Sequence, residues 1–209
     1  MWSASSQSEL TRGYQASIAA TDRFAHVTQT AYEPNVHYPR EWPAIDLSDA
    51  LRDTARLVKA DLGIQVISID FGSWDMHTNY GSVGSGNMRN MIASFARTLD
   101  AFLRDLGSHR GRVTVFTISE FGRRIHENGS RGLDHGWGNM MLVAGAGVKG
   151  GKYYAKWPGL GSGADDDLAV TTDYRQVLGE VIRSRFPERS LPKVFPGFVV
   201  DSTGLGLMR

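Results

Sequence analysis

The sequence contains no cysteine, which excludes disulfide bonds, thiolate metal ligands and a cysteine nucleophile but leaves the cellular compartment open. It lacks any apolar run close to the roughly 20 residues that a membrane-spanning helix needs, and its first residues are too polar for a signal peptide. It also lacks an excess of charge of one sign, because 23 basic and 22 acidic side chains give a net charge of +1. We therefore expect no nucleic-acid partner and no membrane span.

Length and composition suit one globular domain with a real core, because 209 residues with an apolar share of 41% are ordinary for such a domain. We predict a single α/β domain over residues 1–209. It would consist of an N-terminal helix with an extended connection (1–43), an α/β core (44–186) and an irregular tail (187–209). Prolines in the connection, and prolines and glycines in the tail, argue against regular structure in these two places.

Helices and strands are predicted from the spacing and type of the apolar residues. The clearest helix is Asn87–Leu106, where apolar side chains recur every three or four residues until Gly107 ends the pattern. Weaker patterns of the same kind predict helices at 5–31, 46–62 and 173–185, the last capped by Thr172 or Asp173. Segments rich in β-branched residues predict strands at 64–69, 112–119, 139–144 and 168–170.

The order of these elements indicates the fold class. After the first helices come a strand, a helix, three strands and a helix, and the strands are almost entirely apolar. Strands of that kind are usually buried on both faces, which is typical of a parallel sheet. We therefore predict an α/β fold with a mainly parallel sheet and helices on both faces.

Two acid–histidine pairs and a further carboxylate lie where a metal site would need them. Asp75 and His77 follow the first strand, and an extended backbone would point both the same way. Asp134 and His135 lie between two glycines, which can bend the loop until both side chains face one ion. Glu120 follows the next strand, at the end where ligands collect in open α/β sheets. Carboxylate and imidazole groups suit a divalent metal, and we expect zinc, manganese or calcium.

These residues also have purely structural interpretations. Asp75 and His77 could form a turn-stabilising pair, and Glu120 could pair with Arg123 or Arg124. No Gly-x-Ser-x-Gly motif marks a nucleophilic serine, and neither glycine-rich stretch has the Lys-Ser/Thr of a phosphate-binding loop. The sequence therefore predicts a metal site without naming a nucleophile.

Several motifs in residues 44–186 resemble those of a large bacterial family of uncharacterised proteins in the alkaline phosphatase and sulfatase superfamily. They occur in the same order and at plausible spacing. The motifs are Gly72-Ser73-Trp74-Asp75-Met76-His77, Thr117-Ile118-Ser119-Glu120-Phe121-Gly122-Arg123, Asp134-His135-Gly136, the stretch 142–151, and Thr172-Asp173-Tyr174-Arg175.

The resemblance implies a three-layer α/β sandwich, incomplete in this chain, and one or two metals that assist the hydrolysis of phosphate or sulfate esters. It implies that Asp75, His77, Asp134 and His135 bind the metal, with Glu120 beside them or as a further ligand. A small anionic ester is then the expected substrate. Proteins of the family often carry a twin-arginine export signal, so the resemblance implies an extracytoplasmic location, although this sequence shows no such signal.

One part of the resemblance is missing. Related enzymes take an early aspartate ligand and a serine or threonine nucleophile from an N-terminal half, which nothing here resembles. We therefore expect the C-terminal part of a longer protein, or a shortened relative that forms a homo-oligomer, with weak hydrolysis at most. The candidate nucleophiles are Ser73, Thr78, Ser119 and metal-bound water. The alternative is an inactive binding or assembly module, which the missing half favours and the intact acid–histidine pairs oppose.

Overall fold

The computed structural model describes residues 4–161, 163 and 166–209. The chain groups into two compact units. The first runs to Gly72 and resumes over Met91–His109, and the second comprises Ser73–Asn90 and Arg110–Arg209. The single domain over 1–209 stays a prediction, because compact units of one chain need not fold independently.

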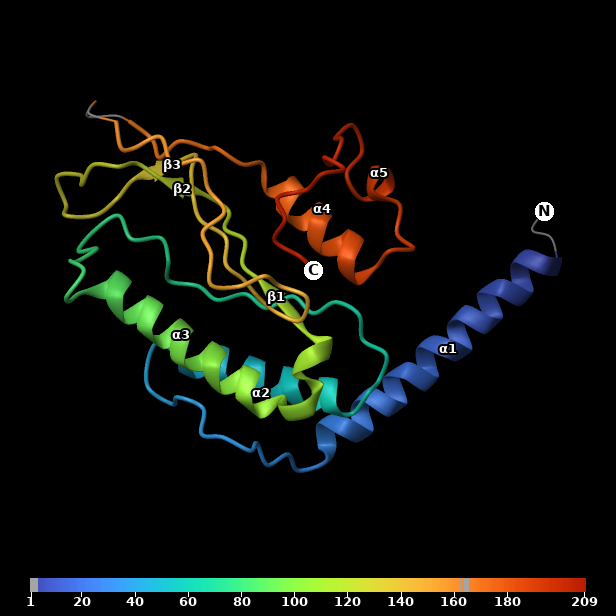
Figure 1. Cartoon of the computed structure of the whole chain (residues 1–209). Helices are drawn as coiled ribbons and strands as arrows, with labels where there is room; N and C mark the ends of the chain where they lie inside the picture. The colour runs from blue at the N-terminus through green and yellow to red at the C-terminus, as the bar shows by residue number, and fades with distance from the viewer. Residues whose placement is uncertain (1–3, 162, 164–165) are drawn as a thin grey trace. The chain divides into compact units, whose positions relative to one another are not determined.

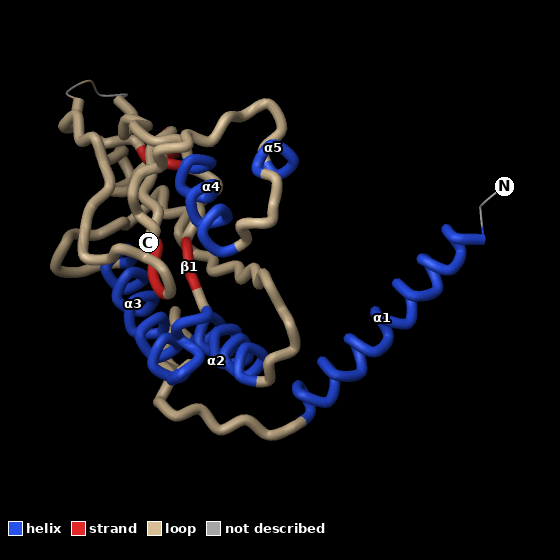
Figure 2. Tube along the Cα trace, turned by 45° about the vertical axis from the view of Figure 1, so that its right-hand side comes forward, coloured by secondary structure: helices blue, strands red, loops and turns tan. Residues whose placement is uncertain are grey.

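The first unit is helical. Helix α1 spans Ala4–Gln29, α2 spans Ile45–Lys59, and α3 spans Asn87–Asp105, with its first turn in the second unit. A short 3₁₀ helix, η1, follows over Gly107–Arg112. Figures 1 and 2 both draw α2 beside α3. The three helices expected in this part of the chain are confirmed, and their ends differ by only a few residues from those that apolar spacing predicts.

The core of the first unit is built from the apolar stripes of α2 and α3. The hydroxyl groups of Ser48 on α2 and Thr98 on α3 lie 3.4 Å apart, so the two stripes face each other. The buried apolar side chains along them are Leu47, Leu51, Ala55, Met91, Leu99, Ala101 and Phe102. Since full burial of a leucine or phenylalanine contributes about 1.5–3 kcal/mol, these side chains together stabilise the unit.

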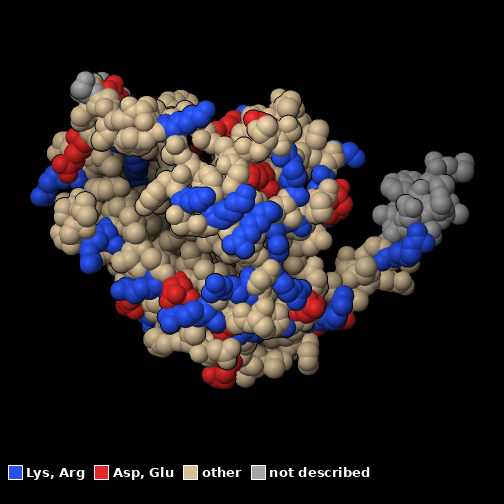
Figure 3. Space-filling model, viewed as in Figure 1, with Lys and Arg blue, Asp and Glu red and all other residues tan. Residues whose placement is uncertain are grey.

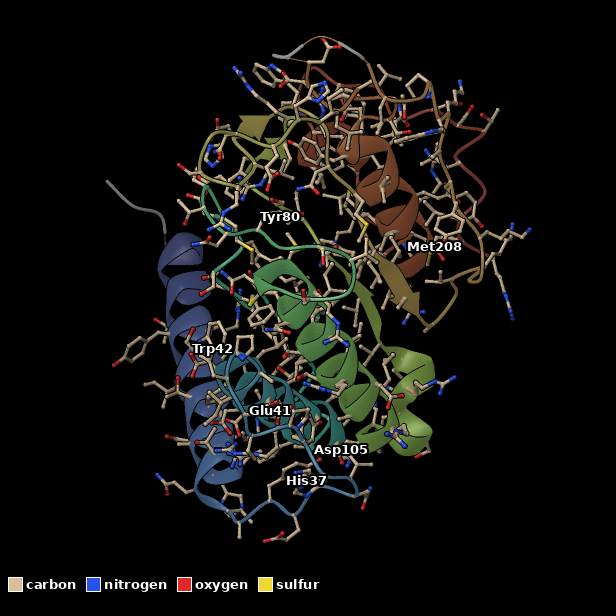
Figure 4. The ribbon with its side chains drawn as sticks, turned by 90° about the vertical axis from the view of Figure 1, so that its left-hand side faces the viewer. His37, Glu41, Trp42, Tyr80, Asp105 and Met208 are labelled. Atoms are coloured by element: carbon tan, nitrogen blue, oxygen red, sulfur yellow. The ribbon has the colours of Figure 1, made fainter. Side chains whose placement is uncertain are left out.

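A buried carboxylate joins the extended segment after α1 to this core. Asp105, at the end of α3, accepts hydrogen bonds from the hydroxyls of Tyr32 (2.7 Å) and Tyr38 (3.0 Å), the Asn35 amide (3.0 Å) and Lys59 Nζ (2.7 Å). Figure 4 labels Asp105 where the segment passes the end of α3. Burial raises the pKa of Asp105, but the hydrogen bonds, led by that from Lys59, outweigh burial and hold the pKa below its ordinary value.

The second unit contains two small antiparallel sheets instead of the predicted parallel one. β1 (Thr114–Phe116) pairs with β4 (Val143–Gly145), with Val115 opposite Ala144. β2 (Gly122–Arg123) pairs with β3 (His135–Gly136), with Arg123 opposite His135. The prediction of a mainly parallel sheet with helices on both faces is therefore wrong, and so is the three-layer sandwich that the resemblance implied.

The direction of pairing follows from the connections. A parallel pair needs a crossover of a dozen or more residues, usually a helix, whereas the chain between β1 and β4 forms the β2–β3 hairpin. It therefore turns back on itself and pairs antiparallel. The predicted strand at 64–69 has no strand partner among the described residues, and Val66 is 75% exposed. Its β-branched content favours extended backbone but cannot supply the neighbouring strand that a sheet requires.

Two helices follow in the second unit. α4 spans Tyr174–Arg185, and its N-cap Asp173 accepts a hydrogen bond from the Arg175 amide (2.8 Å), which confirms one of the two predicted caps. The short helix α5 spans Leu191–Val194, inside the tail that was predicted to be irregular. The predicted strand at 168–170 does not form, and the only β-pairing beside it among the described residues is an isolated bridge between Arg124 and Asp167.

The last residues of the chain pack against α4. The buried carboxylate of Glu180 accepts hydrogen bonds from the backbone amides of Leu205 (2.6 Å) and Met208 (2.9 Å). Val181, Leu207 and Met208, the last labelled in Figure 4, form a small buried apolar cluster. This cluster and the two bonds to Glu180 hold the tail in place.

Charges of both signs are mixed on the one face of the molecule that Figure 3 draws. On the face drawn in Figure 3, Lys and Arg side chains lie among Asp and Glu side chains. Several form exposed ion pairs, such as Arg97 with Glu41 (2.8 Å) and Arg104 with Asp100 (2.6 Å), which contribute little stability in water. Within the described residues, no helix has both the length and the apolar character needed to cross a membrane.

Candidate metal centre

Two loops of the second unit carry the two acid–histidine pairs. The first histidine loop is residues 73–80, and the second histidine loop is residues 128–136. Backbone hydrogen bonds join the loops, from the amides of Asn79 and Tyr80 to the carbonyls of Ser130 and Arg131, and from the Leu133 amide to the Met76 carbonyl. These bonds bring Asp75 and His77 close to Asp134 and His135, which lie 57 to 60 residues later in the sequence.

A glycine allows the two loops to touch. A Cβ atom at Gly132 would collide with the carbonyl carbon and oxygen of His77 and with the Thr78 amide nitrogen. A Cβ at Gly136 would likewise collide with the backbone of Arg123 on the paired strand. Neither glycine has a positive φ. These glycines are therefore needed for space, and not for the sharp bend that sequence analysis attributed to them.

Three possible metal ligands converge where the loops meet. Asp75 Oδ1 lies 3.0 Å from His77 Nε2 and 2.8 Å from His135 Nε2, and the two Nε2 atoms are 3.2 Å apart. Neighbouring ligands at about 2.0–2.2 Å from a metal ion are themselves about 3 Å apart in octahedral and about 3.4 Å apart in tetrahedral coordination. The three side chains are 44–55% exposed, so solvent and a small ligand can reach these atoms. Spacing and access therefore both fit a metal ion with open positions.

Asp134 occupies the opposite side of the His77 ring. Its Oδ1 lies 2.7 Å from His77 Nδ1 and is not among the converging atoms. Since an ionised carboxylate only accepts hydrogen bonds, Nδ1 carries a proton, and Nε2 is the nitrogen that faces Asp75 and His135. A carboxylate behind a histidine is the common arrangement in metal sites, where it fixes the tautomer that binds the ion.

Both aspartates are held in the ionised form that this arrangement needs. The hydrogen bond from His135 lowers the pKa of Asp75, and the charge of the Arg123 guanidinium, 3.6 Å away, lowers it further. The hydrogen bonds from His77 and then from Asn128 lower the pKa of Asp134. At neutral pH, Asp75 is therefore a competent ligand and Asp134 a competent acceptor.

An aromatic ring fixes the plane of His135. The Phe121 ring stacks on the imidazole, with ring centroids 4.1 Å apart and planes inclined by 10°. The guanidinium carbon of Arg123 lies 4.7 Å from the centroid of the same Phe121 ring, a cation–π contact. His135 is thus oriented by packing on Phe121 as well as by its bond to Asp75.

The other predicted site residues lie outside this cluster. Glu120 is exposed, and none of the described residues pairs with it. Arg123, one of the two partners suggested for it, instead has its Nη2 atom 3.6 Å from Asp75 Oδ1. Among the candidate nucleophiles, the Ser119 hydroxyl donates to the Phe121 carbonyl at 2.9 Å and is thereby engaged. The structure therefore brings together the two acid–histidine pairs and leaves Glu120 apart from them.

Sequence reasoning missed two residues of the site. Asn128 donates to the His77 carbonyl and to Asp134, and Arg123 donates to the carbonyls of Trp74 and Leu133. Asn128 precedes a glycine, and that pair is typical of an ordinary turn. Arg123 could be noticed only as a charge near Glu120. Bonds from a side chain to a distant carbonyl leave no pattern in the sequence.

Comparison with known proteins identifies a family but no function. No curated protein and no solved structure matches this chain. Residues 25–177 match the family described as "Protein of unknown function (DUF1501)", and this range includes both histidine loops. Since the match covers well over half of the 209 residues, the chain belongs to this family of proteins of unknown function.

Proposed function

We propose that Asp75, His77 and His135 bind a divalent transition metal and that the site hydrolyses small phosphate- or sulfate-type esters. The observation that carries the metal site is the convergence of three ligand atoms at 2.8–3.2 Å, with His77 held in the ligating tautomer by Asp134. A divalent cation at this point would accept electron pairs from Asp75 Oδ1 and from both Nε2 atoms.

The donor set favours particular metals. Two imidazole nitrogens and one carboxylate suit zinc or manganese better than calcium, which prefers six to eight oxygen ligands. Three protein ligands with open positions are characteristic of catalytic zinc sites, whereas structural sites are closed by four. Asp75, His77 and His135 would therefore hold the ion and leave positions free for water and substrate.

The proposed reaction adds water to an ester and releases an alcohol and an acid. A divalent ion supplies Lewis acidity, which polarises the ester oxygen and lowers the pKa of bound water. Asp134 would keep the proton on His77 Nδ1, and Phe121 would hold the His135 ring in place. Because no serine or threonine is marked as a nucleophile, water is the proposed nucleophile and slow turnover is expected.

The substrate class rests on the resemblance to the alkaline phosphatase and sulfatase superfamily. That resemblance is carried by the motifs around Asp75, Glu120 and Asp134. It supports phosphate or sulfate esters over other hydrolysable groups, because members of the superfamily act on them. An extracytoplasmic location belongs to the same proposal.

Elemental analysis of the purified protein tests the metal site. We expect about one zinc or manganese ion per chain in the wild type, and loss of metal in His77→Ala and in His135→Ala. His126→Ala is the matched control, because His126 is an exposed histidine of the same unit outside the cluster. Full metal content in both site variants would overturn the proposal.

Turnover of aryl phosphate and aryl sulfate, measured with added zinc or manganese, tests the chemistry separately. We expect slow hydrolysis of at least one ester, abolished by His135→Ala and unaffected by His126→Ala. Metal binding without any hydrolysis would favour an inactive binding or assembly module. Turnover that survives His135→Ala would place the chemistry elsewhere.

A further inference from the structure

Arg123 spans the space between the two histidine loops. Its guanidinium nitrogens donate to the Trp74 carbonyl in the first histidine loop and to the Leu133 carbonyl in the second. The side chain is only 14% exposed. A largely buried guanidinium bonded to both loops resists their separation, because moving either loop would leave a buried donor unpaired.

Asn128 makes a second bridge between the same loops. Its side-chain nitrogen donates to the His77 carbonyl (3.0 Å) in the first histidine loop and to Asp134 Oδ1 (2.8 Å) in the second. Its side-chain oxygen accepts from the amides of Ser130 (2.9 Å) and Gly132 (3.0 Å). An asparagine side chain has two N–H donors and one oxygen that can accept two hydrogen bonds. All four of these hydrogen bonds are made here.

Neither side chain is suited to touch a metal or a substrate. The two guanidinium nitrogens of Arg123 that could form a fork around an anion are directed at backbone carbonyls, and its plane lies near the Phe121 ring. The Asn128 oxygen is occupied by two amides. What both residues do control is the separation of the loops, and this separation sets the distance from His135 to Asp75 and His77.

We propose that Arg123 and Asn128 are positioning residues that hold Asp75, His77 and His135 at ligand spacing in the metal-free protein. This inference rests on the proposed metal site. A prearranged site binds its ion more tightly, because less ordering is left for the binding step. Changes to residues behind metal ligands typically weaken metal affinity 10–100-fold, and we expect losses of that size from either bridge.

Conservative substitutions distinguish the loss of the bridging hydrogen bonds from a loss of side-chain volume. Arg123→Lys keeps the charge, but a single ammonium cannot span two carbonyls as the guanidinium fork does. Asn128→Asp keeps the shape and loses both donors. The matched controls are Arg97→Lys, at an exposed pair in the first unit, and Asn90→Asp, at an exposed position on α3.

Two measurements on purified full-length chains test the proposal. Metal-free protein is titrated with cobalt, followed by its visible absorption, and the bound cobalt is then displaced with zinc. We expect 10–100-fold weaker binding and an altered cobalt spectrum for Arg123→Lys and Asn128→Asp, and wild-type behaviour for both controls. Amide hydrogen exchange on the metal-free proteins should be faster in residues 73–80 and 128–136 of the two variants and unchanged in β1 and β4.

The outcomes distinguish this inference from the function on which it rests. Wild-type cobalt affinity and wild-type exchange in both variants would overturn the positioning role while leaving the metal site intact. If the wild type binds neither cobalt nor zinc, the proposed function fails, and unchanged exchange in the two loops would then also overturn the role of the bridges. If Arg123→Lys does not fold, Asn128→Asp decides the question alone.

Discussion

At the scale of single residues, Asp134 determines which nitrogen of His77 is available to a metal. Replacing it with asparagine keeps its size but allows the side-chain amide to donate to Nδ1, which would move the ring proton to Nε2 and block ligation. We expect Asp134→Asn to weaken zinc affinity about 10–100-fold with all three ligands intact. Competition with a chelator of known affinity measures this. Wild-type affinity in the variant would show that the tautomer is fixed by other means. Asp70→Asn, at an exposed aspartate outside the cluster, serves as the control.

Gly132 gives a second residue-scale prediction. Gly132→Ala would place a methyl group into the His77 carbonyl and push the two histidine loops apart, whereas Gly129→Ala meets nothing within 4 Å. We expect Gly132→Ala to destabilise the fold by about 1–3 kcal/mol, as overpacking does, and to weaken zinc binding. Thermal melts and zinc titration of the two variants provide the comparison. Equal melting temperatures and equal zinc affinities in the two variants would mean that the loops can separate without loss of stability.

Side-chain chemistry explains which parts of the site could be predicted from the sequence. Asp75, His77, Asp134 and His135 could be selected from the sequence because carboxylates and imidazoles are typical metal ligands, and because one pair follows an apolar segment and the other lies between two glycines. The sequence could not show that Asp134 lies behind His77 and is not a ligand, because this depends on which nitrogen of His77 faces the other two ligands. The metal itself stays a prediction.

At the scale of elements, Asp105 connects α3 to the segment after α1, and its pKa predicts how acid affects this connection. Because the folded-state pKa lies below the ordinary value of about 4, the stabilisation is present above that pH and is lost as pH falls through the lower, folded-state value. We expect the melting temperature of the first unit to fall over this acidic range. The same measurement on Asp105→Asn should show a weaker dependence on pH.

Asp105→Asn should also destabilise the protein at neutral pH. It removes a charge that accepts four hydrogen bonds, at a cost of about 2–4 kcal/mol. Asp100→Asn on the same helix is the control, because its exposed pair with Arg104 should contribute less than about 1 kcal/mol. Urea unfolding of the two variants measures both values. An equal loss in both would show that Asp105 contributes no more than a surface charge.

The helices and the strands differ in how well the sequence predicts them. α3 begins at Asn87 and ends at Asp105, almost as expected, because its apolar stripe and the glycine after it are local signals. The segment 64–69 carries an equally clear β-branched signal and still forms no strand within the part of the chain that the structure describes. A strand depends on a neighbour supplied by distant sequence, and direction of pairing depends on the connection, so composition alone gave the wrong sheet.

At the scale of the whole molecule, metal binding should stabilise the fold. A ligand that binds only the folded state raises the free energy of unfolding by about 2.7 kcal/mol at a hundredfold excess over its dissociation constant. We expect zinc or manganese to raise the melting temperature of metal-stripped protein, and His77→Ala to remove the effect. Identical melting temperatures with zinc, manganese, calcium and no metal would contradict a metal site.

The close approach of backbones around the site also bears on how this gene can change over generations. Glycine becomes alanine through a single nucleotide change in any glycine codon, so the variant arises often. At Gly132 and Gly136 the new methyl group would collide with backbone atoms, whereas at Gly129 and Gly150 nothing lies within 4 Å. Selection should therefore keep glycine at the first two positions in descendants of this gene, and the other two should be free to drift.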